Sequence, residues 1–538
     1  MRRSAKWWAP LLAALMVTVF AAPAYADHAD RTDVDNITDH GDVPQSEPGI
    51  TSDIAFWGNT AYQGNFNGWR IIDITNKDVP VLVDRYDECN GGQGDVMIWN
   101  DILFRSWDQP AAAGGASCGT HTVAEGEEGI HAFDVSNPTN PVFLDFIDLV
   151  AGSHTATLVP DIANDRLLIY NGPSSGTTGP GIDIIEVELE DDLATVENER
   201  GQMTLLRREN TNRSCHDNGV FLGTVLKVVC AGGDGFTVLS MDPEDGGSLT
   251  NPRMMYSKAV HDVTIGHSAT FTNDGKTFVF GHEPGGGVIA SCENQDPDAF
   301  RTFFFFDTSS GEQVGKWEVP EQGSTENCTP HNMNVIPTTD GSDIMVSGNY
   351  QAGTWVTDFT NPKEPVVVAH SDPPPLSPTE LILGGAWSTY WYNDYLYETD
   401  ISKGLHIMSI TNDANAETAQ HLPYLNPQTQ MARVPQFIKS ASSVTIKHND
   451  SPHRFRGKVS SDDAGCSADR KVTIRKARDG RDRWIGAATT GAQGGYRVAH
   501  KRGGAGRYYA VVKKNTVSDG VDTTTCRWGD SDRIRVDS

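Results

Sequence analysis

The stretch GWRIIDITNKDVP, from Gly68 to Pro80, recurs as GIHAFDVSNPTNP from Gly129 to Pro141 and as GTWVTDFTNPKEP from Gly353 to Pro365. Four weaker copies share its alternating apolar run and begin at Gly181, Gly235, Arg301 and Gly404, of which the copy at Arg301 lacks the glycine. The steps between the seven equivalent positions are 61, 52, 54, 67, 51 and 51 residues. A unit of about fifty residues that recurs at such regular steps predicts a repeat architecture.

Each clear copy of the repeat is accompanied by further strand-like runs. DIAFWG and TAYQG precede the first copy, WSTYWYN and YLYETD precede the last, and apolar runs such as VLVDRY follow the closing proline. Turn residues such as Asn393-Asp394 separate these runs. Four short strands in each of seven units predict an all-β fold with a seven-bladed β-propeller over residues 51–430.

The same motif resembles the LVIVD-repeat family of secreted and surface propellers. The resemblance rests on the glycine, the apolar run, the Asp, the Val/Ile-Ser/Thr-Asn-Pro step and the closing proline. It implies a propeller fold and an extracellular location, and it implies no particular activity. Within the motif, the Asp is expected to cap the following turn by accepting backbone N–H bonds.

The charge is divided along the chain. The 538 residues carry a net charge of −28, but Val444 to Ser538 hold 20 Lys and Arg against 11 Asp and Glu. Subtracting this +9 and the +3 of residues 1–26 leaves −40 for the segment from Asp27 to Ser443. This charge excludes nucleic acid and anionic membranes as partners of this part. The C-terminal part is basic, so anionic partners are not excluded for it.

The N-terminus predicts export. Residues 1–26 contain Arg2, Arg3 and Lys6, an apolar run, and Ala24-Tyr25-Ala26 as a cleavage site, which together describe a secretory signal peptide. A membrane anchor is the alternative, but the apolar run is shorter than the roughly 20 residues that span a bilayer. We expect a secreted protein, in solution or associated with the cell wall, with no transmembrane segment after signal removal. Residues 27–50 are expected to form an acidic, solvated N-terminal arm.

Eight cysteines fit an oxidising compartment, where an even number is expected to pair. Connectivity does not follow from sequence alone, and sequential pairing would join Cys89 to Cys118, Cys215 to Cys230, Cys292 to Cys328 and Cys466 to Cys526.

Residues 431–443 are expected to form a linker, and residues 444–538 a second domain. Alternating runs such as KVTIRKA and RYYAVVKK predict about seven strands, which indicate a small β-sandwich. The Gly-x-Tyr and Tyr-Tyr-Ala-Val-Val strands resemble Ig-like or prealbumin-like sandwiches. The charge of +9 would suit a cell-wall polyanion or the acidic propeller, or would serve solubility alone.

A group of histidines stands outside the motif. In four of the blades, the residue at or near the start of the innermost strand is a histidine: His154, His216, His267 and His331. Asp53, Asp95 and Trp387 hold the equivalent places in the other blades, and Asp217, Asn332 and His282-Glu283 lie close in sequence. Innermost strands start at one mouth of the channel, and imidazoles with carboxylates suit zinc, copper or iron. The alternative is a polar ring that only hydrogen-bonds across the pore.

Two functions follow from these observations. The sequence favours a non-enzymatic extracellular scaffold that binds an unidentified extracellular protein or cell-wall ligand. The second hypothesis is a metal-dependent oxidoreductase or hydrolase that uses the four histidines and a transition metal ion; the catalytic residues are not indicated.

Overall fold

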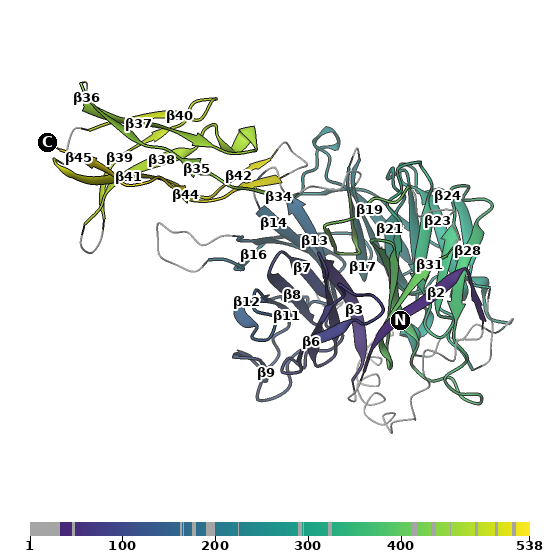
Figure 1. Ribbon diagram of the computed structural model, residues 1–538. Helices are drawn as coiled ribbons and strands as arrows, with labels where there is room; N and C mark the ends of the chain where they lie inside the picture. Colours follow the sequence, from purple (N-terminus) through teal and green to yellow (C-terminus); the bar gives the residue numbers. More distant parts are fainter. Residues whose placement is uncertain are drawn as a thin grey trace. The chain divides into compact units, whose positions relative to one another are not determined.

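The computed structural model contains strands and short 3-10 turns and belongs to the all-β class, as predicted (Figure 1). It describes residues 33–45, 49–161, 164, 166–174, 179–189, 199–223, 225–288, 293, 295–320, 325–411, 418–431, 437–451, 453–478, 482–500, 504–518 and 523–537. The chain divides into two compact units with a boundary between Ala432 and Arg433, apart from residues 162–165. The proposed signal peptide lies outside the described residues. Among the residues described, no helix is long and apolar enough to cross a membrane.

The described residues of the first unit form seven sheets of four or five strands, which we number from first to seventh along the chain. In the first sheet the order is β32 (Tyr424–Leu425), β3 (Thr51–Trp57), β4 (Thr60–Asn65), β5 (Gly68–Asp73) and β6 (Val81–Tyr86).

The next three sheets repeat this arrangement of four consecutive strands. They comprise β7 (Val96–Trp99), β8 (Ile102–Trp107), β11 (Gly129–Asp134) and β12 (Val142–Asp148); β13 (Thr155–Asp161), β14 (Arg166–Gly172), β15 (Ile182–Val187) and β16 (Met203–Glu209); and β17 (Asp217–Leu222), β18 (Leu226–Gly232), β19 (Gly235–Ser240) and β20 (Arg253–Ala259), joined by β33 (Thr429–Met431). The hairpin of β9 (Ala116–Cys118) and β10 (His121–Val123) is inserted before β11.

The last three sheets follow the same order. They comprise β21 (Gly266–Phe271), β22 (Thr277–His282), β23 (Thr302–Asp307) and β24 (Gln313–Glu318); β25 (Met333–Val335), β26 (Ile344–Gly348), β27 (Thr354–Asp358) and β28 (Val366–Asp372); and β29 (Ala386–Tyr392), β30 (Tyr395–Asp400) and β31 (Gly404–Ile410). Short 3-10 turns occupy Pro243–Asp245, Pro284–Gly287 and Asp298–Arg301. The motif found in the sequence forms the third strand of every sheet.

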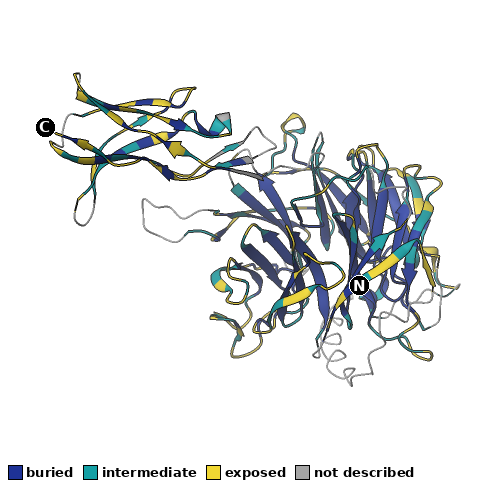
Figure 2. Cartoon of the chain, in the orientation of Figure 1, coloured by how far each residue is buried: buried dark blue, intermediate teal, exposed yellow. Residues whose placement is uncertain are grey.

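The innermost strands form a closed ring. Each contacts the next, from β3 to β7, β13, β17, β21, β25 and β29, and β29 contacts β3 again. We interpret the seven sheets as the blades of a propeller. Their strands are largely buried (Figure 2), because clusters of apolar side chains fill the space between neighbouring sheets.

The N-terminal arm is not the solvated segment that its acidic composition predicts. Of the predicted arm, β1 (Asp33–Asp35) pairs with β28, and β2 (Ile37–Pro44) pairs antiparallel with β31 as the fourth strand of the seventh sheet. The acidic composition misleads because these carboxylates face histidines: His406 contacts Asp39 at 3.0 Å and Asp42 at 2.7 Å.

Residues 418–431, which we call the crossing segment, contact every sheet. Gln420 and Leu422 bond to the sixth and seventh sheets, and Pro423 accepts a hydrogen bond from Gly58 N at 2.9 Å. Farther along, the crossing segment forms hydrogen bonds through its side chains and backbone with one residue in each of the other four innermost strands. These residues are Ile98 of β7, Leu158 of β13, Val220 of β17 and Phe271 of β21. Most of these contacts lie toward the C-terminal ends of the innermost strands, so the crossing segment covers the end of the ring opposite the strand starts.

The second unit contains three sheets. They comprise β34 (Phe437–Ser440), β43 (Thr523–Cys526) and β42 (Asn515–Ser518); β35 (Ser443–Val444), β37 (His453–Ser460), β36 (Lys447–Asp450) and β40 (Gly495–Ala499); and β39 (Arg483–Thr489), β38 (Lys471–Lys476), β41 (Gly506–Val512), β44 (Gly529–Asp530) and β45 (Ile534–Val536), with a 3-10 turn at Ala464–Cys466. Phe455 of β37 and Val472 of β38 belong to one hydrophobic core, so two of the sheets share it. The sandwich arrangement stays a prediction.

The predicted linker, residues 431–443, is wrong in part. Phe437–Ser440 pairs in parallel with Thr523–Cys526, and Ser443–Val444 pairs with β37. The Ser- and Ala-rich composition of this segment resembles that of a linker. The pairing of Phe437–Ser440 is not visible in the local sequence because its partner strand lies more than eighty residues away.

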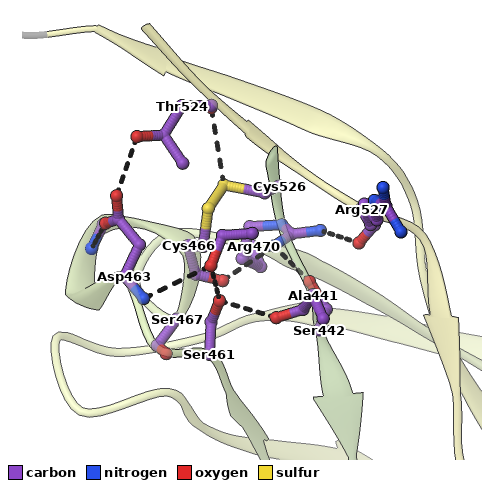
Figure 3. The surroundings of a disulfide bond; sticks show 12 residues. Ala441, Ser442, Ser461, Asp463, Cys466, Ser467, Arg470, Thr524, Cys526 and Arg527 are labelled. Carbon is purple, nitrogen blue, oxygen red and sulfur yellow. Dashed lines mark hydrogen bonds between the residues drawn. A yellow bond between two sulfur atoms is a disulfide. The ribbon is translucent and has the colours of Figure 1, made fainter. Parts of the chain in front are cut away.

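Three predicted disulfides are present in the described residues: Cys89–Cys118, Cys215–Cys230 and Cys466–Cys526. Cys292 lies outside the described residues, so its pairing with Cys328 stays a prediction. Beside Cys466, the buried Arg470 guanidinium donates to the carbonyls of Cys466 and Arg527 (Figure 3). It also donates to the carbonyl of Lys513.

Candidate metal site

The structure brings all four predicted histidines into one row. The ring centroids of His154 and His216 are 4.2 Å apart, those of His216 and His267 4.2 Å, and those of His267 and His331 4.3 Å. Each histidine stands at or just before the start of an innermost strand, in the third to sixth sheets. The repeat therefore places them at equivalent positions around one end of the ring.

Hydrogen bonds at Nδ1 orient the histidines at the two ends of this row. His154 Nδ1 lies 2.8 Å from Asp108 Oδ1, while its Nε2 lies 2.7 Å from His216 Nε2. At the other end, His331 Nδ1 donates to the carbonyl oxygen of Trp387. A bond at Nδ1 leaves Nε2 as the ligand atom, which is how proteins fix metal-binding histidines.

The row from His216 to His331 is largely buried and its nitrogens are incompletely satisfied. His267 and His331 are only 3% and 1% exposed. His216 Nδ1, His267 Nδ1 and His331 Nε2 are buried without a hydrogen-bond partner. Unpartnered buried polar atoms are costly, and three such nitrogens close together are available to bind a ligand.

Glu283, directly after β22, faces two of these histidines. Its carboxylate oxygens lie 3.8 Å from His267 Nε2 and 3.4 Å from His331 Nε2, and it accepts a hydrogen bond from Tyr350 Oη at 2.5 Å. Two overlapping sets thus gather ligand atoms within 4.8 Å of one another: His216, Asp217 and His267, and His267, Glu283 and His331.

The electrostatics favour neutral imidazoles in the middle of the row. Burial, reinforced by the neighbouring histidines, lowers the pKa of His216 and of His267 well below the usual value. For His154, burial also opposes the charged form, but the adjacent Asp108 outweighs it and raises the pKa to about 9. Neutral imidazole is the form that binds metal ions.

Three aspartates line the same cavity as the histidines: Asp53 of β3, Asp95 before β7 and Asp217 of β17. Burial raises the pKa of all three, to about 7 for Asp217 and well above the usual range for Asp95. Repulsion from Asp53 and Asp217 adds to the shift in the pKa of Asp95, so the carboxyls lie close enough to interact.

The crossing segment reaches this cavity from the opposite end of the ring. Gln428 Nε2 donates to Asp53 Oδ2 at 2.8 Å, and Gln428 lines the cavity. Trp387 and Asn332 also line it, as their positions at strand starts predict.

Three residues that contact this site are not indicated by the sequence pattern. Asp108 is 46 residues from His154, Tyr350 is 67 residues from Glu283, and Gln428 comes from a segment expected to end the propeller. None belongs to the repeat, so no periodic signal marks them. His282, by contrast, does not join the row: its Nδ1 lies 3.1 Å from the carbonyl of Ala299 and its Nε2 3.1 Å from Thr264 N.

Comparison with known families gives one match. Residues 48–88 match the model of the LVIVD repeat. This range contains β3 to β6 of the first sheet, so the match supports the resemblance that the repeated motif indicated. A search among curated proteins found no match to the chain.

Proposed function

We propose that the protein is an extracellular LVIVD-repeat propeller that binds one transition metal ion in its central cavity. His216, His267 and His331 supply the nitrogen ligands and Glu283 supplies a carboxylate, because these residues belong to the two sets whose ligand atoms lie within 4.8 Å of one another. His154 contacts His216 and belongs to neither set. The observation that carries the proposal is the row of four imidazoles with three buried, unpartnered nitrogens. Nitrogen-rich sites with one carboxylate select zinc, copper or iron over calcium or magnesium.

The burial of the row favours metal retention over turnover of a large substrate. His267 and His331 are almost inaccessible to solvent, so only small molecules could reach a metal held between them. This supports the scaffold function more than an oxidoreductase or hydrolase, with the metal stabilising the ring or serving as cargo.

The test is metal analysis of purified protein. After supplementation with zinc or copper and removal of loosely bound ions, wild type is expected to retain one equivalent. The His216→Ala, His331→Ala double variant is expected to retain less than about a tenth of that, because each substitution removes a direct ligand.

His421→Ala is the matched control, because His421 is 63% exposed, bonds to Asp394 and lies outside the row. It is expected to bind metal like wild type. Wild-type protein that retains no transition metal, or equal retention in the double variant, would contradict the proposal.

A further inference from the structure

A second group of histidines belongs to the second unit, and the proposed function of the propeller does not use it. His448 and Asp450 lie on β36, His453 begins β37, and His500 directly follows β40. His448, Asp450 and His453 each offer one ligand atom, and these atoms lie within 4.8 Å of one another. The group therefore has the composition and the spacing of a metal site.

The pairing of three neighbouring strands brings these side chains to one face of a sheet (Figure 1). His448 and Asp450 are two residues apart on β36, so their side chains point to the same side. Asp450 is the register partner of His453 on β37, and His500 N donates to the carbonyl of His453 at 3.1 Å on the other side of that strand. Cross-strand partners share a face, so the four side chains gather at one end of the sheet.

His448 is held at both of its ring nitrogens. Its Nδ1 lies 3.1 Å from Asp450 Oδ1, and its Nε2 lies 3.0 Å from His500 Nδ1. Two ligands of a tetrahedral zinc ion are about 3.3 Å apart, given zinc–ligand bonds of about 2.0 to 2.1 Å, so His448 Nδ1 and Asp450 Oδ1 are spaced to share an ion. The contact with His500 leaves Nδ1 of His448 as the ligand atom and fixes the orientation of its ring.

The group is packed on one side and open on the other. The rings of His448 and His500 lie 5.0 and 4.8 Å, between centroids, from Phe455, a fully buried residue of the core of the second unit. These contacts hold the imidazoles in place without an ion. The His448 side chain is 8% exposed, whereas that of Asp450 is 87% exposed and His453 is exposed as well. An ion can therefore enter from solvent.

We propose that His448, Asp450 and His453 form a site for a divalent transition metal ion, zinc above all, in the basic second unit. Two imidazoles and one carboxylate are a zinc ligand set, and they leave the fourth position of a tetrahedral ion to water. Nitrogen ligands disfavour calcium and magnesium, which prefer oxygen. The site shares no residue with the histidine row of the propeller, so neither proposal depends on the other.

The test is calorimetric titration of chelator-treated full-length protein with zinc. Because an exposed site with three ligands exchanges readily with solvent, it is measured at equilibrium, and removal of loosely bound ions would empty it. The His216→Ala, His331→Ala variant, which lacks two propeller ligands, is expected to bind one equivalent. Adding His453→Ala is expected to weaken this binding at least about tenfold, since even the loss of a group that only orients a ligand costs about that much. His453→Ala alone is expected to remove one equivalent from the titration of otherwise wild-type protein.

His261→Ala is the matched control, because His261 also forms an exposed pair with an aspartate, at 2.9 Å from Asp262, but belongs to no ligand set among the described residues. It is expected to leave the titration unchanged. Since His453 is exposed, His453→Ala is expected to keep the zinc-free unfolding transition of the second unit, which separates a lost ligand from a lost fold.

Three results would overturn the proposal: no zinc binding by the His216→Ala, His331→Ala variant, equal zinc affinity after His453→Ala, or magnesium binding as tight as zinc. Failure of the propeller site gives a different result. Wild type and the His216→Ala, His331→Ala variant would then bind the same number of equivalents, and His453→Ala would still remove one.

Discussion

The glycine that opens the repeat is required by packing against the next strand. A Cβ atom on Gly68 would lie 1.8 Å from the carbonyl oxygen of Tyr86, and one on Gly129 would lie 1.8 Å from that of Ile147. Both carbonyls belong to the outermost strand of the same sheet. The glycine of the motif is therefore explained by the close approach of the third and fourth strands, and it does not indicate a binding function.

The motif aspartate acts as predicted. Asp73 Oδ1 accepts from Thr75 N at 2.8 Å, Asp134 from Ser136 N at 2.8 Å, and Asp358 from Thr360 N at 2.9 Å. The same short-range bond in three sheets explains why Asp recurs at this place in the chain: it satisfies the backbone of the turn that leads to the outermost strand.

Asp343 illustrates the cost of a partly buried carboxylate outside the cavity. Burial raises the pKa of Asp343 to about 6, so the folded chain holds this proton more tightly than the unfolded chain. Its contribution to stability is complete below about pH 4 and is lost as the pH rises through 6. Asp343→Asn removes the buried charge and can keep the hydrogen bond from Asn273 N.

We expect Asp343→Asn to raise the free energy of unfolding by about 1 to 3 kcal/mol near pH 7.5 and to leave it unchanged near pH 4. Urea unfolding at both pH values measures this difference. Asp340→Asn, three residues away at an exposed turn, is the control and should give no gain at either pH. An equal effect of Asp343→Asn at both pH values would refute the explanation.

At the scale of elements, β2 is the strand that completes the seventh sheet. Its backbone pairs with β31, and the carbonyl of Val43 accepts from Arg70 Nη2 at 2.7 Å in the first sheet. This strand therefore links the last sheet to the first. Without it, β31 would become an exposed edge.

Deletion of residues through Pro44 is expected to lower the free energy of unfolding by about 3 kcal/mol or more, in the range of the most damaging single changes. Deletion through Asp35 removes only β1, whose three residues are exposed, and should cost less than about 1 kcal/mol. Urea unfolding followed by tryptophan fluorescence compares the two truncations. Equal stability of both would show that β2 does not hold the ring closed.

The elements show which parts of the fold a sequence can reveal. The third strands and the histidines were predictable because each recurs at the period of the repeat. Other features could not be predicted, because each depends on a single pairing between residues far apart in sequence. These are the ring closure by β2, the path of the crossing segment and the contact of Asp108 with His154. Glu283 is intermediate: it lies beside a strand end, but only the folded sheet shows that it faces His267 and His331.

At the scale of the whole molecule, the division of charge coincides with the division into units. Nearly all the acidic part forms the first unit, and the whole basic part lies in the second. The second unit has its own hydrophobic core and its own disulfide. A unit with a separate core is expected to unfold separately.

Disulfides offer a way to perturb each unit alone. Cys466 and Cys526 are 60 residues apart, so their bond removes chain entropy worth about 4 kcal/mol from the unfolded second unit. The Cys466→Ala, Cys526→Ala variant is expected to lower only the transition of the second unit in a calorimetric scan. The matched pair Cys89→Ala, Cys118→Ala, whose cysteines are 29 residues apart, should lower only the transition of the first unit, by about 3 to 4 kcal/mol. If either pair shifted both transitions together, the two units would have to fold as one cooperative body, and metal binding in the propeller would then stabilise the basic unit as well.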